Sequence, residues 1–243
     1  MHIQSDGRYF DELVESQGDF NPFTDRGWST LRRRFEGASD GASGLRVLDV
    51  GCGTGRSRQI YARQAAHYVG LDLSFAALRA ASLREPAIDW LQGDALRLPF
   101  DNDSFDVVAF SSVLHHVPDR AAALLAAYRV VRPGGLVFAF DPNLLHPAML
   151  LFRHPRSPLY RQEGVSPDER PLNPAVLHEA FARAGFARIG QRCQSDIAYR
   201  SVAPKLLNAA LPLYNALDRV WEAVGAGRLF GTFVITWGRR GAS

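Results

Sequence analysis

The chain has 243 residues, of which 47% are hydrophobic, 22% charged and 11% aromatic. These values suit one α/β domain with a sizeable core, and they exclude a disordered, fibrous or disulfide-scaffold protein. The formal net charge of +3 is modest and the basic residues are scattered, which argues against a nucleic-acid partner. No apolar stretch reaches the ~18 residues of a membrane span, and no export signal is visible. We therefore expect no stable membrane insertion and a cytoplasmic location.

From residue 45 onward, short apolar runs alternate with helical stretches, a pattern typical of a parallel sheet covered on both faces. The first five runs cover residues 46–50, 67–71, 88–92, 105–111 and 136–141. Ser74 and Asp119 are suitable N-caps for two of the helices between them, and Asn173 begins another before Pro174. Two further strands are expected at 187–193 and 232–237. The sequence predicts an α/β, doubly wound, seven-stranded and mostly parallel sheet.

The domain organisation that we expect is a single unit over residues 1–243. Residues 1–44 would form an N-terminal helical segment or lid, and residues 45–141 the cofactor-binding core. Residues 142–172 and 194–230 would be substrate-covering insertions. Apolar residues at helical spacing in the second insertion predict one or two amphipathic helices before the last strand. These helices could pack on the sheet or on a homodimer partner, or they could roof the active site together with the N-terminal segment Tyr9 to Trp28. A membrane-surface helix is a weaker third alternative, because the polar faces carry few basic residues.

The segment VLDVGCGTG follows the first predicted strand, where an open parallel sheet binds its ligand. Gly51, Gly53 and Gly55 allow a ligand to lie against the backbone. A dinucleotide fingerprint would need glycine at position 56, which is Arg56, and no lysine pair of a P-loop follows. Asp49 would repel a pyrophosphate and attract an ammonium group. The motif favours a cationic adenosine cofactor without phosphate.

On these residues the chain resembles a class I S-adenosylmethionine-dependent methyltransferase of the small-molecule group that includes ubiquinone-type enzymes. The resemblance implies S-adenosylmethionine as cofactor and a Rossmann-like fold. It also implies that the glycine loop, with Asp49, Gly51, Gly53 and Gly55, contacts the methionine moiety of the donor. Asp72, at the end of the second predicted strand, would bind the ribose hydroxyls, because a carboxylate accepts two hydrogen bonds from a vicinal diol.

Later segments extend the same resemblance. In QGDALRLPF, Asp94 would accept a hydrogen bond from the adenine amino group and Ala95 would offer its backbone. Leu73 would pack against the adenine ring. The end of the fourth strand, from Ser111 to His116, would run beside the methionine tail and face the substrate. The segment RVVRPGGLVFAF resembles the family's fifth strand and the residues before it.

Two adjacent histidines, His115 and His116, are the candidate general bases for removing an acceptor's proton. Adjacent side chains at a strand end point in different directions, so we expect at most one to face substrate. Their alternative role is to cap the turn or to pack against the cofactor. Asp141 is the only acid placed nearby, so no metal is expected.

The predicted reaction is transfer of a methyl group to an O or N atom of a small organic molecule, such as an aromatic or apolar natural product. A lipid-linked or quinone acceptor is the first alternative. A second alternative, of another class, is a scaffold or inactive subunit that binds S-adenosylmethionine without turnover. A nucleic-acid acceptor is disfavoured, because SSVLHH stands where base-methylating enzymes carry an Asn or Asp-Pro-Pro-aromatic motif.

Overall fold

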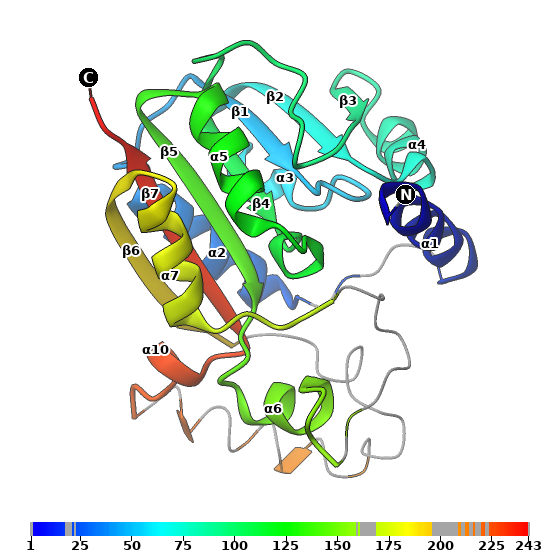
Figure 1. Cartoon of the computed structure of the whole chain (residues 1–243), viewed down its shortest axis with the longest axis vertical. Helices are drawn as coiled ribbons and strands as arrows, with labels where there is room; N and C mark the ends of the chain where they lie inside the picture. The colour runs from blue at the N-terminus through cyan, green and yellow to red at the C-terminus, as the bar shows by residue number, and fades with distance from the viewer. Residues whose placement is uncertain are drawn as a thin grey trace.

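The computed structural model describes residues 2–17, 21, 23–158, 160, 169–195, 209, 212–213, 216, 220–221 and 224–242. Within this part of the chain, seven strands form one sheet in the order β3-β2-β1-β4-β5-β7-β6 (Figure 1). Their bounds are β1 Leu45–Val50, β2 Ala65–Asp72, β3 Asp89–Gln92, β4 Phe105–Ser111, β5 Val131–Pro142, β6 Phe186–Gln194 and β7 Phe233–Arg240. Strands β1 to β5 are parallel, and β7 runs antiparallel to both β5 and β6. The predicted seven-stranded, mostly parallel sheet is confirmed.

Helices cover both faces of this sheet. Their bounds are α1 His2–Gln17, α2 Asp25–Ala38, α3 Arg58–Tyr61, α4 Phe75–Arg84, η1 Leu114–His116, α5 Arg120–Val130, α6 Pro147–Arg153, α7 Pro174–Arg183 and α10 Gly227–Phe230, where η1 is a single 3-10 turn. Helices α5 and α7 lie in front of the sheet in Figure 1 and α2 lies behind it. Two buried apolar clusters match these layers, one including Leu124 and Phe181 and the other including Leu31 and Phe35. The predicted two-sided covering is therefore confirmed.

The predicted helix starts are also confirmed by their caps. The side chain of Ser74 accepts a hydrogen bond from the amide of Ala77 at the start of α4. Asp119 caps α5 in the same way, and Asn173 caps α7 with Pro174 in the first turn. Each cap satisfies an amide that has no partner within its helix and contributes about 1 kcal/mol to stability.

The fifth strand begins earlier than the sequence pattern indicates. The apolar run starts at residue 136, whereas β5 extends back to Val131. Gly135 permits this, because a Cβ at this position would lie 2.9 Å from the carbonyl oxygen of Asp106 and 2.7 Å from the Val131 side chain. A register shift between Phe105 and Val107 of β4 accommodates the extra length. The sequence Pro133-Gly134-Gly135, which is typical of a turn, thus lies inside strand β5.

Both predicted insertions lie only partly within the described residues. In the first, residues 142–172, the chain forms α6, and Asn143 then pairs with Leu172 in an isolated parallel bridge. In the second, residues 194–230, the described part includes the short helix α10. The apolar residues that predicted longer helices there include Leu206 and Leu207, which lie outside the described residues.

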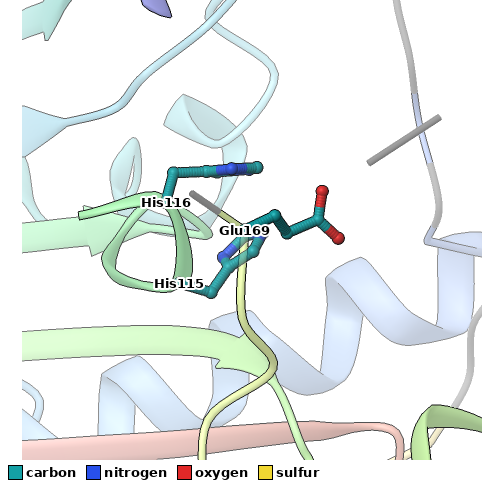
Figure 2. Close-up of side chains that lie close together, drawn as sticks. All are labelled: His115, His116 and Glu169. Carbon is teal, nitrogen blue, oxygen red and sulfur yellow. The ribbon is translucent and has the colours of Figure 1, made fainter. Parts of the chain in front are cut away.

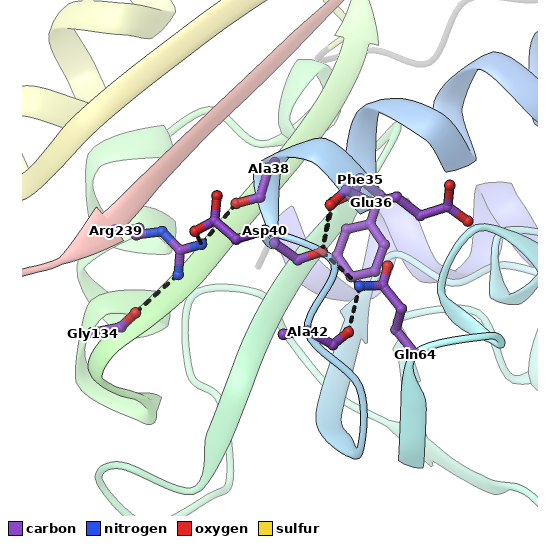
Figure 3. A network of polar contacts seen from close by, with 9 residues as sticks. Phe35, Glu36, Ala38, Asp40, Ala42, Gln64, Gly134 and Arg239 are labelled. Carbon is purple, nitrogen blue, oxygen red and sulfur yellow. Dashed lines mark hydrogen bonds and ion pairs between the residues drawn. The ribbon is translucent and has the colours of Figure 1, made fainter.

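The last strand is tied to the N-terminal half of the fold by Arg239 (Figure 3). Its guanidinium donates to the carbonyl oxygens of Ala38 at 2.9 Å and Gly134 at 3.2 Å, and it pairs with Asp40 at 2.7 Å. These contacts join β7 to the end of α2 and to β5. The contacts of Arg239 therefore help to hold the antiparallel strand β7 in its place beside β5.

A buried amide, Asn143, holds the connection between the end of β5 and the start of β7. It is fully buried, and its Nδ2 donates to the carbonyl oxygens of Leu229 at 3.0 Å and Gly231 at 2.7 Å. Its Oδ1 accepts from the amide of Leu145 at 3.0 Å. Three backbone groups from two distant segments thus depend on one side chain.

Replacement of Asn143 by alanine should lower the free energy of unfolding by about 2–4 kcal/mol, because it leaves buried backbone groups without partners. Urea unfolding followed by circular dichroism measures this loss. Asn102→Ala is the control, since Asn102 is exposed and should cost less than about 0.5 kcal/mol. Equal losses in the two variants would contradict the structural role given to Asn143.

Candidate active site

The carboxyl ends of the parallel strands bring the predicted site residues to one edge of the sheet. The glycine loop follows β1, Asp72 ends β2 and Asp94 follows β3. Ser111 ends β4, and Asp141 lies next to the end of β5. Ligands of open parallel sheets bind at this edge.

The three glycines of the loop have different surroundings. All three have positive φ, at +72° for Gly51, +52° for Gly53 and +82° for Gly55. A Cβ on Gly51 would lie 2.4 Å from that of Val113, and a Cβ on Gly55 would lie 2.6 Å from the ring of Trp90. Nothing lies within 4 Å of the corresponding position on Gly53. Gly51 and Gly55 therefore allow the protein to pack against the loop, and Gly53 leaves open space for a ligand.

Asp49 lies beneath the loop and is fully buried. Its Oδ2 accepts hydrogen bonds from the hydroxyls of Ser57 and Tyr68, both at 2.6 Å, and its Oδ1 accepts from Ser111 Oγ at 2.5 Å. The Ser111 hydroxyl also pairs with that of Tyr61 at 2.9 Å. Burial raises the pKa of Asp49 from 3.8 to about 6, although these hydrogen bonds lower it in part. Direct contact of Asp49 with a donor's ammonium group stays a prediction, whereas its ties to β2, β4 and α3 are visible.

Asp72 connects the end of β2 to the same loop. Its Oδ2 accepts from the amide of Gly53 at 2.7 Å, and its Oδ1 accepts from the amide of Ser74 at 2.9 Å. Burial raises the pKa of this carboxyl group, and the backbone amides oppose that effect. Each oxygen keeps a second acceptor site, so the carboxylate suits a vicinal diol. Leu73 is half-buried directly beside it.

Asp94 carries an acceptor that no described residue satisfies. Its Oδ1 accepts from the amide of Leu96 at 2.9 Å, whereas its buried Oδ2 has no hydrogen-bond partner in the described part of the chain. A buried carboxylate oxygen without a donor is costly. An exocyclic amino group would supply the missing hydrogen bond, as predicted for adenine. Ala95 is buried next to it.

Helix α1 contacts both the start of α4, next to Asp72, and the turn that bears His116. Asp11 accepts hydrogen bonds from Ser74 Oγ at 2.6 Å and from the amide of Ala76 at 2.9 Å, at the start of α4. One residue earlier, the Phe10 ring meets the ring of His116 edge-on, with centroids 5.0 Å apart. Asp11 could not be predicted from the sequence, because nothing near residue 11 signals a partner 63 residues away.

The two histidines lie together on the 3-10 turn η1. His115 is buried, and its Nδ1 and its backbone amide both contact Asp141 Oδ1, at 2.9 and 3.1 Å. The His115 and His116 ring centroids are 3.9 Å apart, so the expectation that the rings diverge is wrong. It assumed strand geometry, in which neighbouring side chains point to opposite faces, whereas in a 3-10 turn they lie only about 120° apart around the axis. Burial, and secondarily His115, lower the pKa of His116 well below 6.5.

Glu169 completes this cluster from a distant part of the sequence (Figure 2). One ligand-type atom from each of His115, His116 and Glu169 lies within 4.8 Å of the other two. The amide of the next residue, Arg170, donates to the carbonyl oxygen of His115 at 2.9 Å and fixes the approach of this segment. Glu169 could not be predicted from the sequence, since no local motif marks a glutamate in the proline-rich connection.

The family described as a methyltransferase domain matches residues 48–139, from β1 to β5. The chain is 37% identical to a demethylmenaquinone methyltransferase of Streptomyces avermitilis, over 75% of this chain and 86% of that relative. It belongs to the S-adenosylmethionine-dependent methyltransferases. A second demethylmenaquinone methyltransferase, from Renibacterium salmoninarum, is also 37% identical, but the match spans 59% of this chain and only 60% of that relative.

A solved structure supports the fold of this methyltransferase. Phosphoethanolamine N-methyltransferase 2 of Haemonchus contortus, in complex with S-adenosyl-L-methionine, superposes with a TM-score of 0.66. The match covers 97% of this chain and 57% of that chain, at 18% sequence identity. The cofactor of the present methyltransferase is S-adenosylmethionine, and the open space at Gly53 and the unpaired Asp94 oxygen fit that group. Among the described residues, no helix is long and apolar enough to cross a membrane.

Asp72→Ala should weaken binding of S-adenosylhomocysteine about 100-fold or more, because two hydrogen bonds to a charged carboxylate are lost together. Isothermal titration calorimetry measures this dissociation constant. Asp89→Ala is the matched control, since Asp89 is exposed on the neighbouring strand β3 and should leave binding unchanged. An unchanged dissociation constant for Asp72→Ala would mean that the ribose lies elsewhere.

Asp49 makes stability depend on pH in a direction opposite to that of most acids. Below pH 3.8 its carboxyl is protonated in both the folded and the unfolded chain, so burial costs little. As the pH rises through about 6, the unfolded chain is already ionised and the folded chain must bury the charge. The free energy of unfolding contributed by this group therefore falls by about 3 kcal/mol.

Asp49→Asn should remove this loss while keeping the shape of the side chain. Urea unfolding of both proteins between pH 4 and 7 should show the variant gaining stability relative to wild type as the pH rises. Asp101→Asn, at an exposed position, should run parallel to wild type. If Asp49→Asn also runs parallel, the buried carboxylate does not carry this penalty.

Proposed function

We propose that the chain transfers a methyl group from S-adenosylmethionine to an oxygen or nitrogen atom of a small, partly apolar acceptor of quinone type. The observation that carries this proposal is the buried contact between His115 and Asp141, at the ends of β4 and β5 beside the donor loop. Because Asp141 engages Nδ1, the Nε2 atom of His115 is the one left to face an acceptor. The relatives named for demethylmenaquinone support a quinone-type acceptor, and a relative from Pseudomonas aeruginosa that is named a ubiquinone biosynthesis O-methyltransferase supports transfer to oxygen.

Apolar residues on the chain that follows β5 support an acceptor with apolar surface. Leu144 and Leu145 directly follow the end of β5 and are half-buried, and Leu150 and Leu151 of α6 are 43% and 42% exposed. Apolar side chains with a few convergent polar groups are typical of small-molecule sites. We propose residues 142–172 and 194–230 as acceptor-covering segments and α1 as the lid. Homodimer formation and a cytoplasmic location stay predictions.

Methyl transfer from a sulfonium is a direct displacement, in which the protein mainly aligns the nucleophile, the methyl carbon and the sulfur. In the proposed geometry, the glycine loop, Asp72 and Asp94 hold the donor. On the opposite side of the site, His115 and its neighbours hold the acceptor. A scaffold that binds the donor without turnover would keep the first set of contacts and need not use the second.

Turnover separates the enzyme from such a scaffold. Incubation of the protein with methyl-labelled donor and native cell extract should yield S-adenosylhomocysteine and place label in low-mass, organic-soluble material. Label found only in RNA or protein would contradict a small-molecule acceptor. Donor binding without any S-adenosylhomocysteine would favour the scaffold.

His115→Asn tests the acceptor side in the same assay. Turnover should fall by about 10²-fold or more, whereas S-adenosylhomocysteine should bind as it does to wild type. His178→Asn, at an exposed position on α7, should change neither quantity. Full turnover by His115→Asn would remove His115 from the proposed acceptor site.

A further inference from the structure

The cluster of His115, His116 and Glu169 has the composition of a metal site (Figure 2). Two imidazoles and one carboxylate are the ligands of many catalytic zinc and non-haem iron centres, in which the remaining positions stay open for water or substrate. In the part of the chain that the structure describes, this is the one place where at least three such groups converge. From the sequence, Asp141 is the only acid expected here, and no metal is predicted.

We propose that His115, His116 and Glu169 bind one divalent first-row transition-metal ion, and that this ion holds the acceptor's oxygen for methylation.

The contact with Asp141 gives the first physical support. A metal-binding histidine usually donates its other ring N–H to a carboxylate, which fixes the tautomer and turns the free nitrogen towards the ion. His115 has this arrangement, with Nδ1 2.9 Å from the fully buried Asp141 Oδ1. Its Nε2 is then the ligand atom. Asp141 also accepts from the backbone amide of His115, so both the ring and its attachment are held in place.

Backbone hydrogen bonds give the second support, because they hold the segment of Glu169 against the histidine turn, although Glu169 is 53 residues after His116. Arg170 donates its amide to the carbonyl oxygen of His115, and Leu172 donates to the carbonyl oxygen of Pro142 at 2.8 Å. These bonds attach the segment beginning at Glu169 to the turn that bears the histidines. Ligand atoms bound tetrahedrally at ~2.0–2.2 Å from one ion lie about 3.4 Å apart. The ligand atoms here lie within 4.8 Å of one another, so a small movement of the half-buried Glu169 side chain would bring the three around one ion.

Charge gives the third support. Fully buried Asp141 and half-buried Glu169 bring two carboxylates to the histidine turn, where a divalent cation would offset their charge. Arg120 contributes positive charge near Asp141, and Arg153 lies near enough to act on Tyr9 together with Glu169. Both arginines offset part of the carboxylate charge, but a guanidinium cannot bind a metal ion. The two imidazoles and Glu169 therefore remain the ligand set.

The chemical role of the ion rests on the proposed function. An acceptor hydroxyl bound to the metal would release its proton to water at a lower pH than when free. The resulting oxygen would attack the methyl carbon, the carbon–sulfur bond would break, and its electron pair would remain on sulfur as neutral S-adenosylhomocysteine. His115 would then act as a ligand, because a nitrogen lone pair bound to metal cannot accept the acceptor's proton. The ion would thus replace the general-base role predicted for His115.

The test is titration of the chelator-treated full chain with Co²⁺ alone, followed by absorption spectroscopy and calorimetry. We expect one Co²⁺ per chain with a visible d–d spectrum, displaced by Zn²⁺. Glu169→Gln and His116→Asn should each weaken Co²⁺ binding at least about tenfold, in keeping with the loss of one ligand. Glu179→Gln and His178→Asn, both on the exposed face of α7, are the matched controls and should bind as wild type does.

Three results would overturn the metal site: no Co²⁺ binding by wild type at millimolar concentration, equal binding by the ligand variants, or equal losses in the α7 controls. Thermal unfolding without metal identifies any variant that fails to fold, and Glu169→Gln, at a half-buried position, keeps the test open if His116→Asn does not fold. Turnover is measured separately. Co²⁺ binding without turnover would leave the site intact and reject the proposed function, whereas full turnover in chelator without Co²⁺ binding would do the reverse.

Discussion

The active-site end of the fold depends on one buried carboxylate, that of Asp49. It lies in the middle of the sheet, in a strand paired on both sides, where an unsatisfied charge would be very costly. Hydroxyl donors from Ser57, Tyr68 and Ser111 make it tolerable, and they come from three different places around β1. Each donor is thereby fixed in turn, so the ends of β1, β2 and β4 keep a constant relation to the glycine loop. The residual cost appears as the raised pKa of Asp49.

The placement of the residues expected to hold the donor could be predicted from sequence, because its determinants are local. Each residue follows its own strand within a few positions, and the sheet then gathers them at one edge. Asp72 and Asp94 lie where the motifs place them, with Asp72 bonded to the amide of Gly53. The sequence could not separate the roles of the glycines. The structure distinguishes them by packing. Val113 packs against Gly51 and Trp90 against Gly55, whereas no atom occupies the corresponding space at Gly53.

The opposite half escaped prediction because its contacts join distant segments. Asp11 reaches the start of α4, and Glu169 reaches the turn after β4, and neither has a local signal. The strand pattern also gave the wrong direction for two adjacent histidines, since the chain turns into a 3-10 helix after Ser112. Ser112 has a φ of +57°, a conformation that few residues other than glycine adopt, and the sequence does not reveal it.

These two kinds of construction suggest how one scaffold can serve different acceptors. The glycine loop, Asp72 and Asp94 stand at the ends of strands, and Asp49 joins β1 to β2 and β4 by hydrogen bonds to Tyr68 and Ser111. The acceptor side is attached to the sheet by backbone hydrogen bonds, from Arg170 to His115 and from Leu172 to Pro142. A backbone hydrogen bond does not require a particular side chain. Substitutions at Arg170 and Leu172 can therefore leave Glu169 beside the histidines. In the proposed function, the sheet would hold the donor and the connection over it would select the acceptor.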